Sequence, residues 1–434
     1  MNFKLLKNKN FAALIFGSAV SLIGSNMQQF ALSLYILAVT QSATIFASML
    51  AISVLPRLLL SPVAGVFGDW FDRKTSIIAL NLANGAFVGS FALLFFFQGA
   101  LSIPQVYIMI LVLEAVEIFY GSAMSAVAPS IVEKEQLFDA NTIRSIIQSL
   151  GSMLSPLIAA TLFGAFGLLP IMIFNALSFI VCAINQMRIA IPKTNKRPDA
   201  INLKNFFLDF KDGLSIIKTH KAIQVIIGLG MILNFSLSPI FSVGLTLVVK
   251  ETLKGSDFQF GLFSTLLSLS MLTGPMFLAP FAKKINVGRL TLGTFFLVAL
   301  LIGSIGLVPV LWHSGLFASN WIPFILLIAI NFVIGMVVGL CNIAIGTLFD
   351  SLVPKQYMGR TGSVMNMGLM VAIPIGQMAA GYAFDNLPEY PIFISAAVIV
   401  LAALAYFGKP LLDATKPLAN DIAHDTITAS EPVA

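Results

Sequence analysis

Long apolar stretches separated by short polar connections make up most of the chain. Twelve of these stretches reach the roughly 20 mostly apolar residues that a membrane-spanning helix needs. Lipid-exposed strands would have to close into a barrel and alternate apolar with polar residues, and runs such as Leu93 to Phe97 do not alternate. The pattern therefore predicts an all-α membrane protein with twelve transmembrane helices. Their expected ranges are 11–37, 44–68, 75–97, 105–128, 142–166, 168–190, 222–249, 258–281, 289–311, 321–347, 362–384 and 391–409.

The longest polar stretch separates the sixth and seventh predicted helices. It runs from Arg188 to Lys221 and is rich in Lys and Arg. Apolar residues between Phe206 and Ile217 recur at helical spacing, which predicts an amphipathic helix on the inner membrane face or against the helix bundle. We expect an N-terminal six-helix bundle, a basic cytoplasmic linker, a C-terminal six-helix bundle and a disordered cytoplasmic tail. Their ranges are 1–187, 188–221, 222–410 and 411–434.

A weak internal repeat favours two pseudo-symmetric bundles. Val132 precedes the fifth predicted helix and its Pro156, and Val353 precedes the eleventh and its Pro374. The two spacings, 24 and 21 residues, align only with a gap. Two related halves with a binding site near the midplane are an arrangement of secondary transporters.

Composition and charge narrow the class of protein. The chain is 58% hydrophobic and 10% charged, whereas soluble domains carry about 25% charged residues. This excludes a soluble enzyme, a nucleic-acid binder and a disordered chain. With the N-terminus inside, 22 of the 25 Lys and Arg residues fall on the cytoplasmic side. This bias predicts that both termini are cytoplasmic. It also explains the net charge of +6 without nucleic acid, and we expect a multi-pass protein of the cell (cytoplasmic) membrane.

A ten-residue motif connects the second and third predicted helices. Residues Gly65 to Lys74 read GVFGDWFDRK, which is a Gly, three residues, an Asp, and a basic pair four and five residues later. This resembles the signature loop of the major facilitator superfamily, and it lies at the family's position, the cytoplasmic end of the second of twelve helices. Trp70 and Asp72 depart from the usual Arg and Gly. The Asp-Arg-Lys ending is similar to the macrolide-efflux (Mef-type) and siderophore-exporter subgroup.

The resemblance implies a cytoplasmic gate between the signature loop and the start of the eleventh helix. Asp69 would interact there with the helix N-terminus and with Arg360. Arg73 could reach Asp350 or Asp139, and the alternative is that Arg73 and Lys74 only enforce topology. The expected gate residues are Gly65, Asp69, Asp72, Arg73, Lys74, Asp350 and Arg360.

The fifth predicted helix carries a second resemblance. Residues 151–160 read GSMLSPLIAA, similar to the superfamily's antiporter motif with Ser and Ala replacing three glycines. In the family this motif accompanies exporters that exchange substrate for protons. Gly151, Ser155 and Pro156 are the residues that match. The alternative is ordinary packing of small residues against a neighbouring helix.

Three ionisable residues lie near the middle of predicted spans. They are Arg57 in the second helix and Glu114 and Glu117 in the fourth. Such a residue costs roughly 2.5–3.5 kcal/mol to insert, so each is a candidate functional group. Loss of water and a neighbouring like charge both disfavour an ionised carboxyl, so the acids could exchange a proton for a cationic substrate. The alternatives are a structural ion pair of Arg57 with either acid, or direct substrate contact without coupling. The family's antiporters commonly have an Arg near the position of Glu114, so that role does not carry over.

Four uncharged polar residues inside predicted spans are candidates for the substrate cavity: Gln28, Gln29, Asn234 and Asn331. Each could equally be an interhelical hydrogen-bond partner. Together these features predict a secondary active transporter, a proton-coupled efflux antiporter of hydrophobic or cationic drugs such as macrolides. The alternatives are an exporter of an endogenous metabolite, such as a siderophore or a lipid-like compound, and a non-transporting scaffold or sensor. No catalytic, nucleotide or metal motif is present, so we expect no enzyme activity, no cofactor and no metal. The expected partners are the substrate, protons and lipid, for a monomer.

Overall fold

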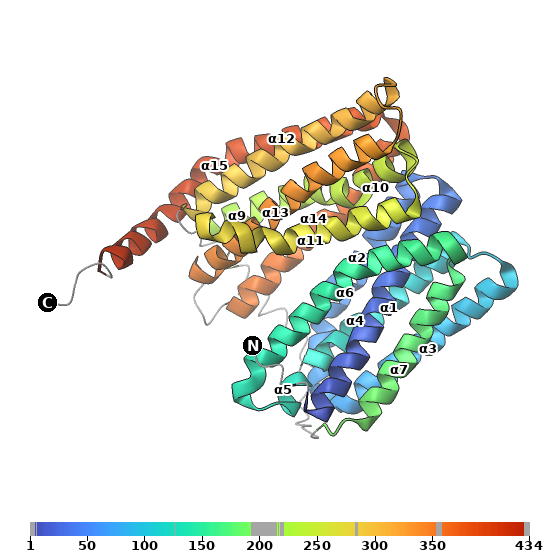
Figure 1. The fold of residues 1–434 in the computed structure, drawn as a ribbon. Helices are drawn as coiled ribbons and strands as arrows, with labels where there is room; N and C mark the ends of the chain where they lie inside the picture. Colours follow the sequence, from blue (N-terminus) through green and yellow to red (C-terminus); the bar gives the residue numbers. More distant parts are fainter. Residues whose placement is uncertain are drawn as a thin grey trace. The chain divides into compact units, whose positions relative to one another are not determined.

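The computed structural model describes residues 5, 7–125, 127–191, 215, 217, 221–282, 285–352 and 358–428, and all secondary structure assigned there is helical (Figure 1). Its elements are α1 (Lys9–Thr40), α2 (Ala43–Trp70), α3 (Arg73–Gln98), α4 (Ile103–Ser125), α5 (Ala128–Ile131), η2 (Lys134–Gln136), α6 (Leu137–Phe166), α7 (Leu169–Arg188), α9 (Lys221–Pro239), η3 (Ile240–Gly244), α10 (Leu245–Leu247), η4 (Val248–Thr252), α11 (Asp257–Ala282), α12 (Val287–His313), α13 (Trp321–Leu352), α14 (Met358–Asn386) and α15 (Glu389–Thr428).

The predicted number of transmembrane helices is confirmed. Within the described residues, 12 helical segments are long and apolar enough to cross a membrane. The seventh of them, Ile223–Thr252, combines α9, η3, α10 and η4, with π-helical turns at η3 and η4. α6 begins at Leu137, five residues before the expected start at 142, so its first turns include polar residues that precede the apolar stretch.

Local sequence explains several helix ends. The Asn8 side chain accepts hydrogen bonds from two backbone N–H groups at the start of α1, and Ser42 does the same for one at the start of α2. These side chains satisfy N–H groups that have no partner within the helix. Gly99 ends α3 with φ 75°, a left-handed conformation that glycine adopts without steric cost.

The chain divides into two compact units, Met1–Asn202 with Gly255–Thr265, and Leu203–Lys254 with Leu266–Ala434. In the first unit α1 packs on α6 and α7, α3 packs on α7, and α2 packs on α4. In the second unit α9 packs on α14 and α15, and α12 packs on α13 and α15. Most of the predicted linker, including its amphipathic helix apart from Ser215 and Ile217, lies outside the described residues; of the rest, only residues 188–191 and 221 are described. The domain boundaries, the pseudo-symmetry and the cytoplasmic termini stay predictions.

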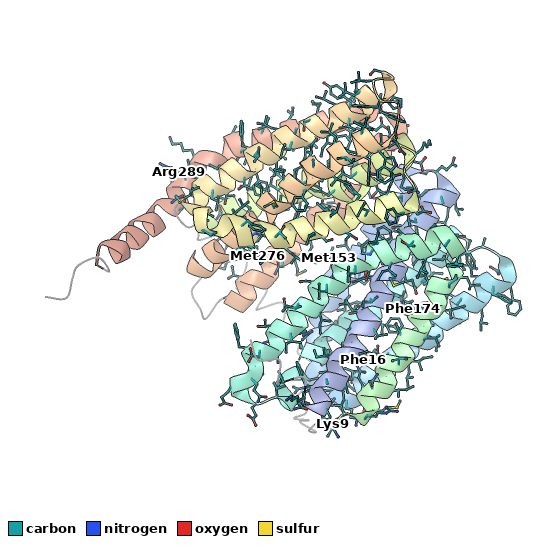
Figure 2. All side chains as sticks on the ribbon, viewed as in Figure 1. Lys9, Phe16, Met153, Phe174, Met276 and Arg289 are labelled. Atoms are coloured by element: carbon teal, nitrogen blue, oxygen red, sulfur yellow. The ribbon has the colours of Figure 1, made fainter. Side chains whose placement is uncertain are left out.

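Close helix contacts and apolar outer surfaces are both visible within each unit. A Cβ atom on Gly85 of α3 would lie 3.1 Å from Ile180 Cγ1 and 3.2 Å from the Ala176 carbonyl oxygen of α7. Small residues allow this close approach, on which helix association in lipid depends. Large apolar side chains such as Phe16 and Met276, which are 60% and 76% exposed, project away from the helices (Figure 2). These outer surfaces suit contact with lipid.

The C-terminal end of the chain differs from the disordered tail predicted at 411–434. α15 continues as a helix to Thr428, so the prediction was wrong for 411–428, and residues 429–434 lie outside the described part. Leu411 and Thr415 are each 1% exposed. Thr415 Oγ1 donates to Asn286 Oδ1 and Asn286 Nδ2 donates to the Thr415 carbonyl, both at 3.1 Å. This packing against the start of α12 stabilises a segment whose composition alone is too polar to predict a helix.

Candidate functional site

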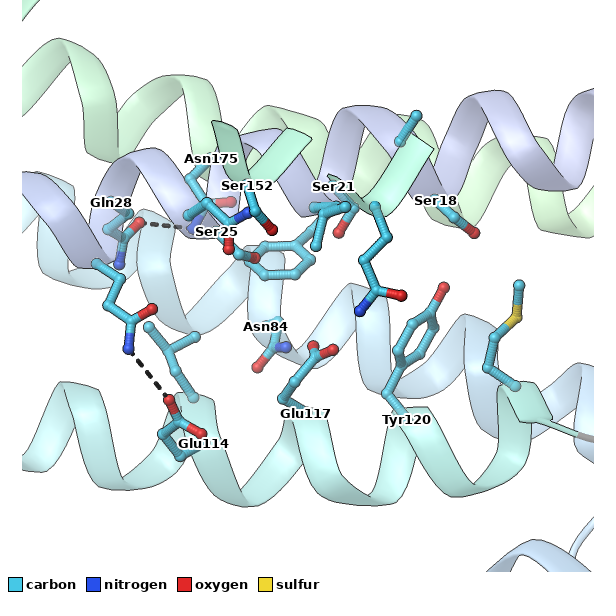
Figure 3. A pocket seen from close by; sticks show the side chains of 18 of the residues that line it. Ser18, Ser21, Ser25, Gln28, Asn84, Glu114, Glu117, Tyr120, Ser152 and Asn175 are labelled. Atoms are coloured by element: carbon cyan, nitrogen blue, oxygen red, sulfur yellow. Dashed lines mark hydrogen bonds between the residues drawn. The ribbon is translucent and has the colours of Figure 1, made fainter. Parts of the chain in front are cut away.

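The first unit contains a cavity of about 330 Å³. Side chains from α1, α2, α3, α4, α6 and α7 line it, and Figure 3 shows several of them pointing inward. Apolar residues such as Leu22, Ile110 and Phe179 form part of its wall. Its charged residues are Arg57, Glu114, Glu117 and Arg144, and its amide residues are Asn26, Gln28, Gln29, Asn84, Gln148 and Asn175. The cavity thus contains five residues predicted from the sequence: Arg57, both glutamates and both glutamines of α1.

Arg57 and Glu114 form an ion pair across α2 and α4. Arg57 Nε lies 3.1 Å from Glu114 Oε2, and the side chains are 50% and 13% exposed. Gln29 Nε2 donates a long hydrogen bond of 3.5 Å to the other oxygen, Glu114 Oε1. Both carboxylate oxygens of Glu114 are therefore engaged. Of the two pairings that the sequence left open for Arg57, the structure has the one with Glu114.

Glu117 lies one turn further along α4, and its side chain points into the cavity (Figure 3). It is exposed to the cavity space. It lies near enough to Glu114 and Arg57 to interact with their charges. None of the described residues is hydrogen-bonded or ion-paired to it. Glu117 is thus a carboxylate that faces an open cavity without a protein partner in the described part of the chain.

Gln28 is held at the cavity wall by Asn175 of α7. Asn175 Nδ2 donates to Gln28 Oε1 at 2.7 Å, and both residues are 1% exposed. The Gln28 Nε2, Asn26 Nδ2 and Asn84 Oδ1 atoms are buried without hydrogen-bond partners among the described residues. Buried polar groups left unpaired are costly, and in native proteins nearly all are satisfied by protein, water or a ligand. These three atoms mark places where a bound molecule can complete the hydrogen bonding.

Arg144 of α6 also lines the cavity, and it is not among the site residues predicted from the sequence. It has no hydrogen-bond or ion-pair partner among the described residues. Gln148 and Ser152 line the cavity from the same helix at intervals of four. Residues four apart share a helix face, so this polar stripe is the signal that could have identified Arg144 from the sequence.

The two candidate asparagines of the C-terminal half do not join this cavity. Asn234 lines a separate, mostly apolar cavity of about 320 Å³ in the second unit, where its Nδ2 donates to the Leu369 carbonyl at 3.1 Å. Asn331 is 1% exposed and donates to the Leu327 carbonyl of its own helix at 2.9 Å. It does not line either cavity.

The predicted gate residues are only partly described. Asp72 caps α3, because its Oδ1 accepts from Thr75 N and Thr75 Oγ1, each at 2.8 Å. Arg73 and Lys74 form the first turn of that helix. The side chains of the remaining gate residues lie outside the described part, and the gate stays a prediction. These residues are Gly65 and Asp69 in α2, Asp350 in α13 and Arg360 in α14.

The antiporter-like motif of α6 packs against α1. A Cβ atom on Gly151 would lie 3.0 Å from Leu22 Cδ2. Ser155 is fully buried, and its Oγ lies 2.6 Å from the Gly151 carbonyl and 3.5 Å from the Ile23 carbonyl. Pro156 lies inside the helix. These contacts show close helix packing, and a role of the motif in proton exchange stays a prediction.

A buried polar cluster adjoins the cavity and was missed in the sequence. Tyr120 lines the cavity one turn beyond Glu117, and Gln186 Nε2 of α7 donates to its hydroxyl at 3.0 Å. Asn81 Nδ2 of α3 donates to Gln186 Oε1 at 2.9 Å. The cluster links α3, α4 and α7 beside the cavity. In the described part of the chain, no group of three or more His, Cys, Asp or Glu residues is arranged to hold a metal ion.

Known proteins match nearly the whole chain. The family model of the Major Facilitator Superfamily matches residues 14–377. Macrolide efflux protein A of Streptococcus pyogenes is 25% identical over 385 residues, which cover 89% of this chain and 92% of that protein. Macrolide efflux protein A of Enterococcus faecalis is 24% identical over 76% of this chain and 98% of that protein. A bacterial homologue of the iron transporter ferroportin in an inward-facing state has a TM-score of 0.69 at 16% identity, covering 95% of this chain and 99% of that one. That last likeness shows the fold alone.

Proposed function

The chain belongs to the major facilitator superfamily of transporters, and we propose that it is a proton-coupled exporter of hydrophobic or cationic compounds such as macrolides. The similarity to macrolide efflux proteins over most of both chains supports this substrate class. The observation that carries the coupling is Glu117, which faces the cavity without a partner among the described residues. The site of action would be the cell membrane, with alternating access of the cavity to its two sides.

Glu117 is better suited than Glu114 to exchange a proton. Glu114 is engaged by Arg57 and by Gln29, so its negative charge is already compensated. Glu117 can be neutralised by a proton or by a cationic group of the substrate, but not by both at once. In a cavity of low dielectric, this competition couples release of one to binding of the other. The charged groups that line the cavity with Glu117 are Arg57, Glu114 and Arg144.

The gate and the antiporter-like motif complete the proposed cycle. Asp69, Arg73 and Arg360 would close the cytoplasmic side in the outward-open state through contacts between the signature loop and the start of α14. The opposite transition would break these contacts and open the cavity to the cytoplasm. Gly151 and Ser155 would preserve the close α1–α6 packing that such rigid-body motion requires.

The test is transport into energised inverted membrane vesicles. Uptake of a panel of hydrophobic cationic dyes and macrolides would be followed with and without a proton gradient. We expect gradient-dependent uptake by the wild type, and its loss in Glu117→Gln, which keeps the side-chain shape and removes the exchangeable proton. Glu135→Gln removes an exposed carboxylate of η2 from the same unit and is the matched control.

Glu114→Gln tests whether Glu114 takes part in proton coupling or only stabilises the helix bundle. If Glu114 only pairs with Arg57, this variant loses stability while its remaining uptake stays gradient-dependent. Gradient-dependent uptake in Glu117→Gln at wild-type rates would contradict the assignment of Glu117. If the wild type transported none of the compounds, this result would favour the alternative function, export of an endogenous metabolite.

A further inference from the structure

We propose that the cavity of the first unit recognises a dipolar amphiphile, a molecule with a cationic group and an anionic group on an apolar body, and that Arg144 binds the anionic group. This inference rests on the proposed function, because it assigns the cationic group to Glu117. It adds a second charged contact to the site, so that molecules carrying both charges should bind more tightly than simple cations do.

The charged residues that line the cavity indicate that its ligand carries two opposite charges. Two of these residues are acidic and two are basic. Arg57 and Glu114 neutralise each other at 3.1 Å, which leaves Glu117 and Arg144. These two have opposite charge and are not paired with each other or with any other described residue. A desolvated charge is costly without a counter-charge, so a ligand that fills the cavity has to compensate both. A ligand with only a cationic group would leave Arg144 uncompensated and would be repelled by it.

The surroundings of Arg144 suit an oxyanion. Gln148 and Ser152 follow it on the same face of α6, both exposed and both lining the cavity. A guanidinium binds a carboxylate or phosphate through two parallel hydrogen bonds, and an amide and a hydroxyl can donate further ones. The three donors extend over about 12 Å of helix at 1.5 Å per residue. This stripe forms the anionic subsite of the proposal.

The surroundings of Glu117 suit a cation with hydrogen-bonding substituents. Figure 3 shows Asn84 beside Glu117, with both side chains pointing into the cavity. Asn84 is 3% exposed and its Oδ1 has no partner among the described residues, so it can accept from an ammonium or hydroxyl group next to Glu117. On α1, the buried Gln28 Nε2 offers a free donor. Apolar side chains such as Leu22 and Phe179 complete the wall, and a volume of about 330 Å³ is within the range of small-molecule sites.

The test compares two probes with the same apolar tail, using purified protein in lipid nanodiscs. N-decyl-N,N-dimethylglycine carries an ammonium and a carboxylate, and decyltrimethylammonium carries only the ammonium. Binding would be measured by calorimetry, with binding to protein-free nanodiscs subtracted. We expect the wild type to bind the dipolar probe about tenfold more tightly than the cation, the equivalent of about 1.4 kcal/mol.

Three substitutions assign the subsites. Arg144→Gln should weaken the dipolar probe about tenfold and leave decyltrimethylammonium unchanged or tighter, because the repelling charge is removed. Arg144→Lys should keep the preference for the dipolar probe, since it keeps the charge. Glu117→Gln should weaken both probes. Arg188→Gln is the matched control, because Arg188 is exposed at the end of α7 and does not line the cavity.

The outcomes separate this inference from the proposed function. A ratio of the two affinities that is the same in wild type and Arg144→Gln would overturn the anionic subsite, as would tighter binding of the cation by the wild type. Neither result would contradict gradient-dependent uptake of cationic dyes, which is a separate measurement. The proposed function is tested separately, by measuring whether Glu117→Gln loses the gradient-dependent uptake of these dyes. If wild type and Arg144→Gln bind neither probe, the inference is overturned even where dye uptake is proton-driven.

Discussion

Gly24→Ala should disturb the cavity wall through α7. A Cβ atom on Gly24 would lie 2.6 Å from Asn175 Oδ1 and 2.6 Å from Ser178 Oγ, too close for either atom to stay in place. Asn175 and Ser178 are 1% and 2% exposed, so neither side chain has free space to move into. Asn175 also holds Gln28 by the hydrogen bond of 2.7 Å, and a shift of Asn175 would weaken that bond.

Three contributions determine the size of the effect. Forcing an extra methyl group into a packed interior costs about 1–3 kcal/mol. Weakening the Asn175–Gln28 hydrogen bond costs about 0.5–1.5 kcal/mol. Alanine regains about 1 kcal/mol over glycine inside a helix. We therefore expect Gly24→Ala to lower the free energy of unfolding by about 0.5–3.5 kcal/mol.

The free energy of unfolding would be measured in lipid bicelles for Gly24→Ala and for Gly89→Ala. Gly89 is the matched control, because a Cβ atom there would lie 4.0 Å from Ala176 Cβ, an ordinary van der Waals distance. The control should therefore be as stable as the wild type or more stable by up to about 1 kcal/mol. Equal stabilisation by both substitutions would mean that α1 and α7 have space between them at Gly24, and would refute the reasoning.

Two further substitutions test packing elsewhere in the chain. Gly288→Ala would place a Cβ atom against Thr415 Oγ1, so the end of α15 should detach from α12. Amide hydrogens beyond Leu411 should then exchange faster, as measured by mass spectrometry. Unchanged exchange rates in this segment would contradict the expectation. Asn81→Leu should lower the free energy of unfolding by about 1–3 kcal/mol, because it leaves the buried Gln186 carbonyl without its donor. Adding Gln186→Leu should recover part of that loss, and additive losses in the double variant would show that the two residues are not coupled.

The number of spans could be predicted because each one is long and apolar, but the pairing of charges could not. Arg57 was expected near Glu114 and Glu117, at a similar height in the membrane. Residues three apart differ by about 60° around a helix axis of 3.6 residues per turn, so the rotation of α4 against α2 decides which acid meets the arginine. That rotation depends on interhelical packing. The tail beyond residue 411 was missed for a related reason, since the Thr415–Asn286 contact joins residues far apart in the sequence.

Arg144 changes the net charge of the site. The three ionisable residues inside the predicted spans, two acids and one base, would leave an excess of negative charge, but with Arg144 the residues that line the cavity have a net charge of zero when all four groups are ionised. A proton on Glu117 then gives the cavity a charge of +1, and so does a monovalent cation beside the ionised Glu117. Both together would give +2, which is unfavourable in a desolvated site. Under the proposed function, the proton-loaded and cation-loaded cavities therefore carry the same charge and replace each other. A dipolar substrate differs, because it has no net charge and the cavity that holds it has a net charge of zero. Exchange of such a substrate for a proton would therefore move net charge across the membrane.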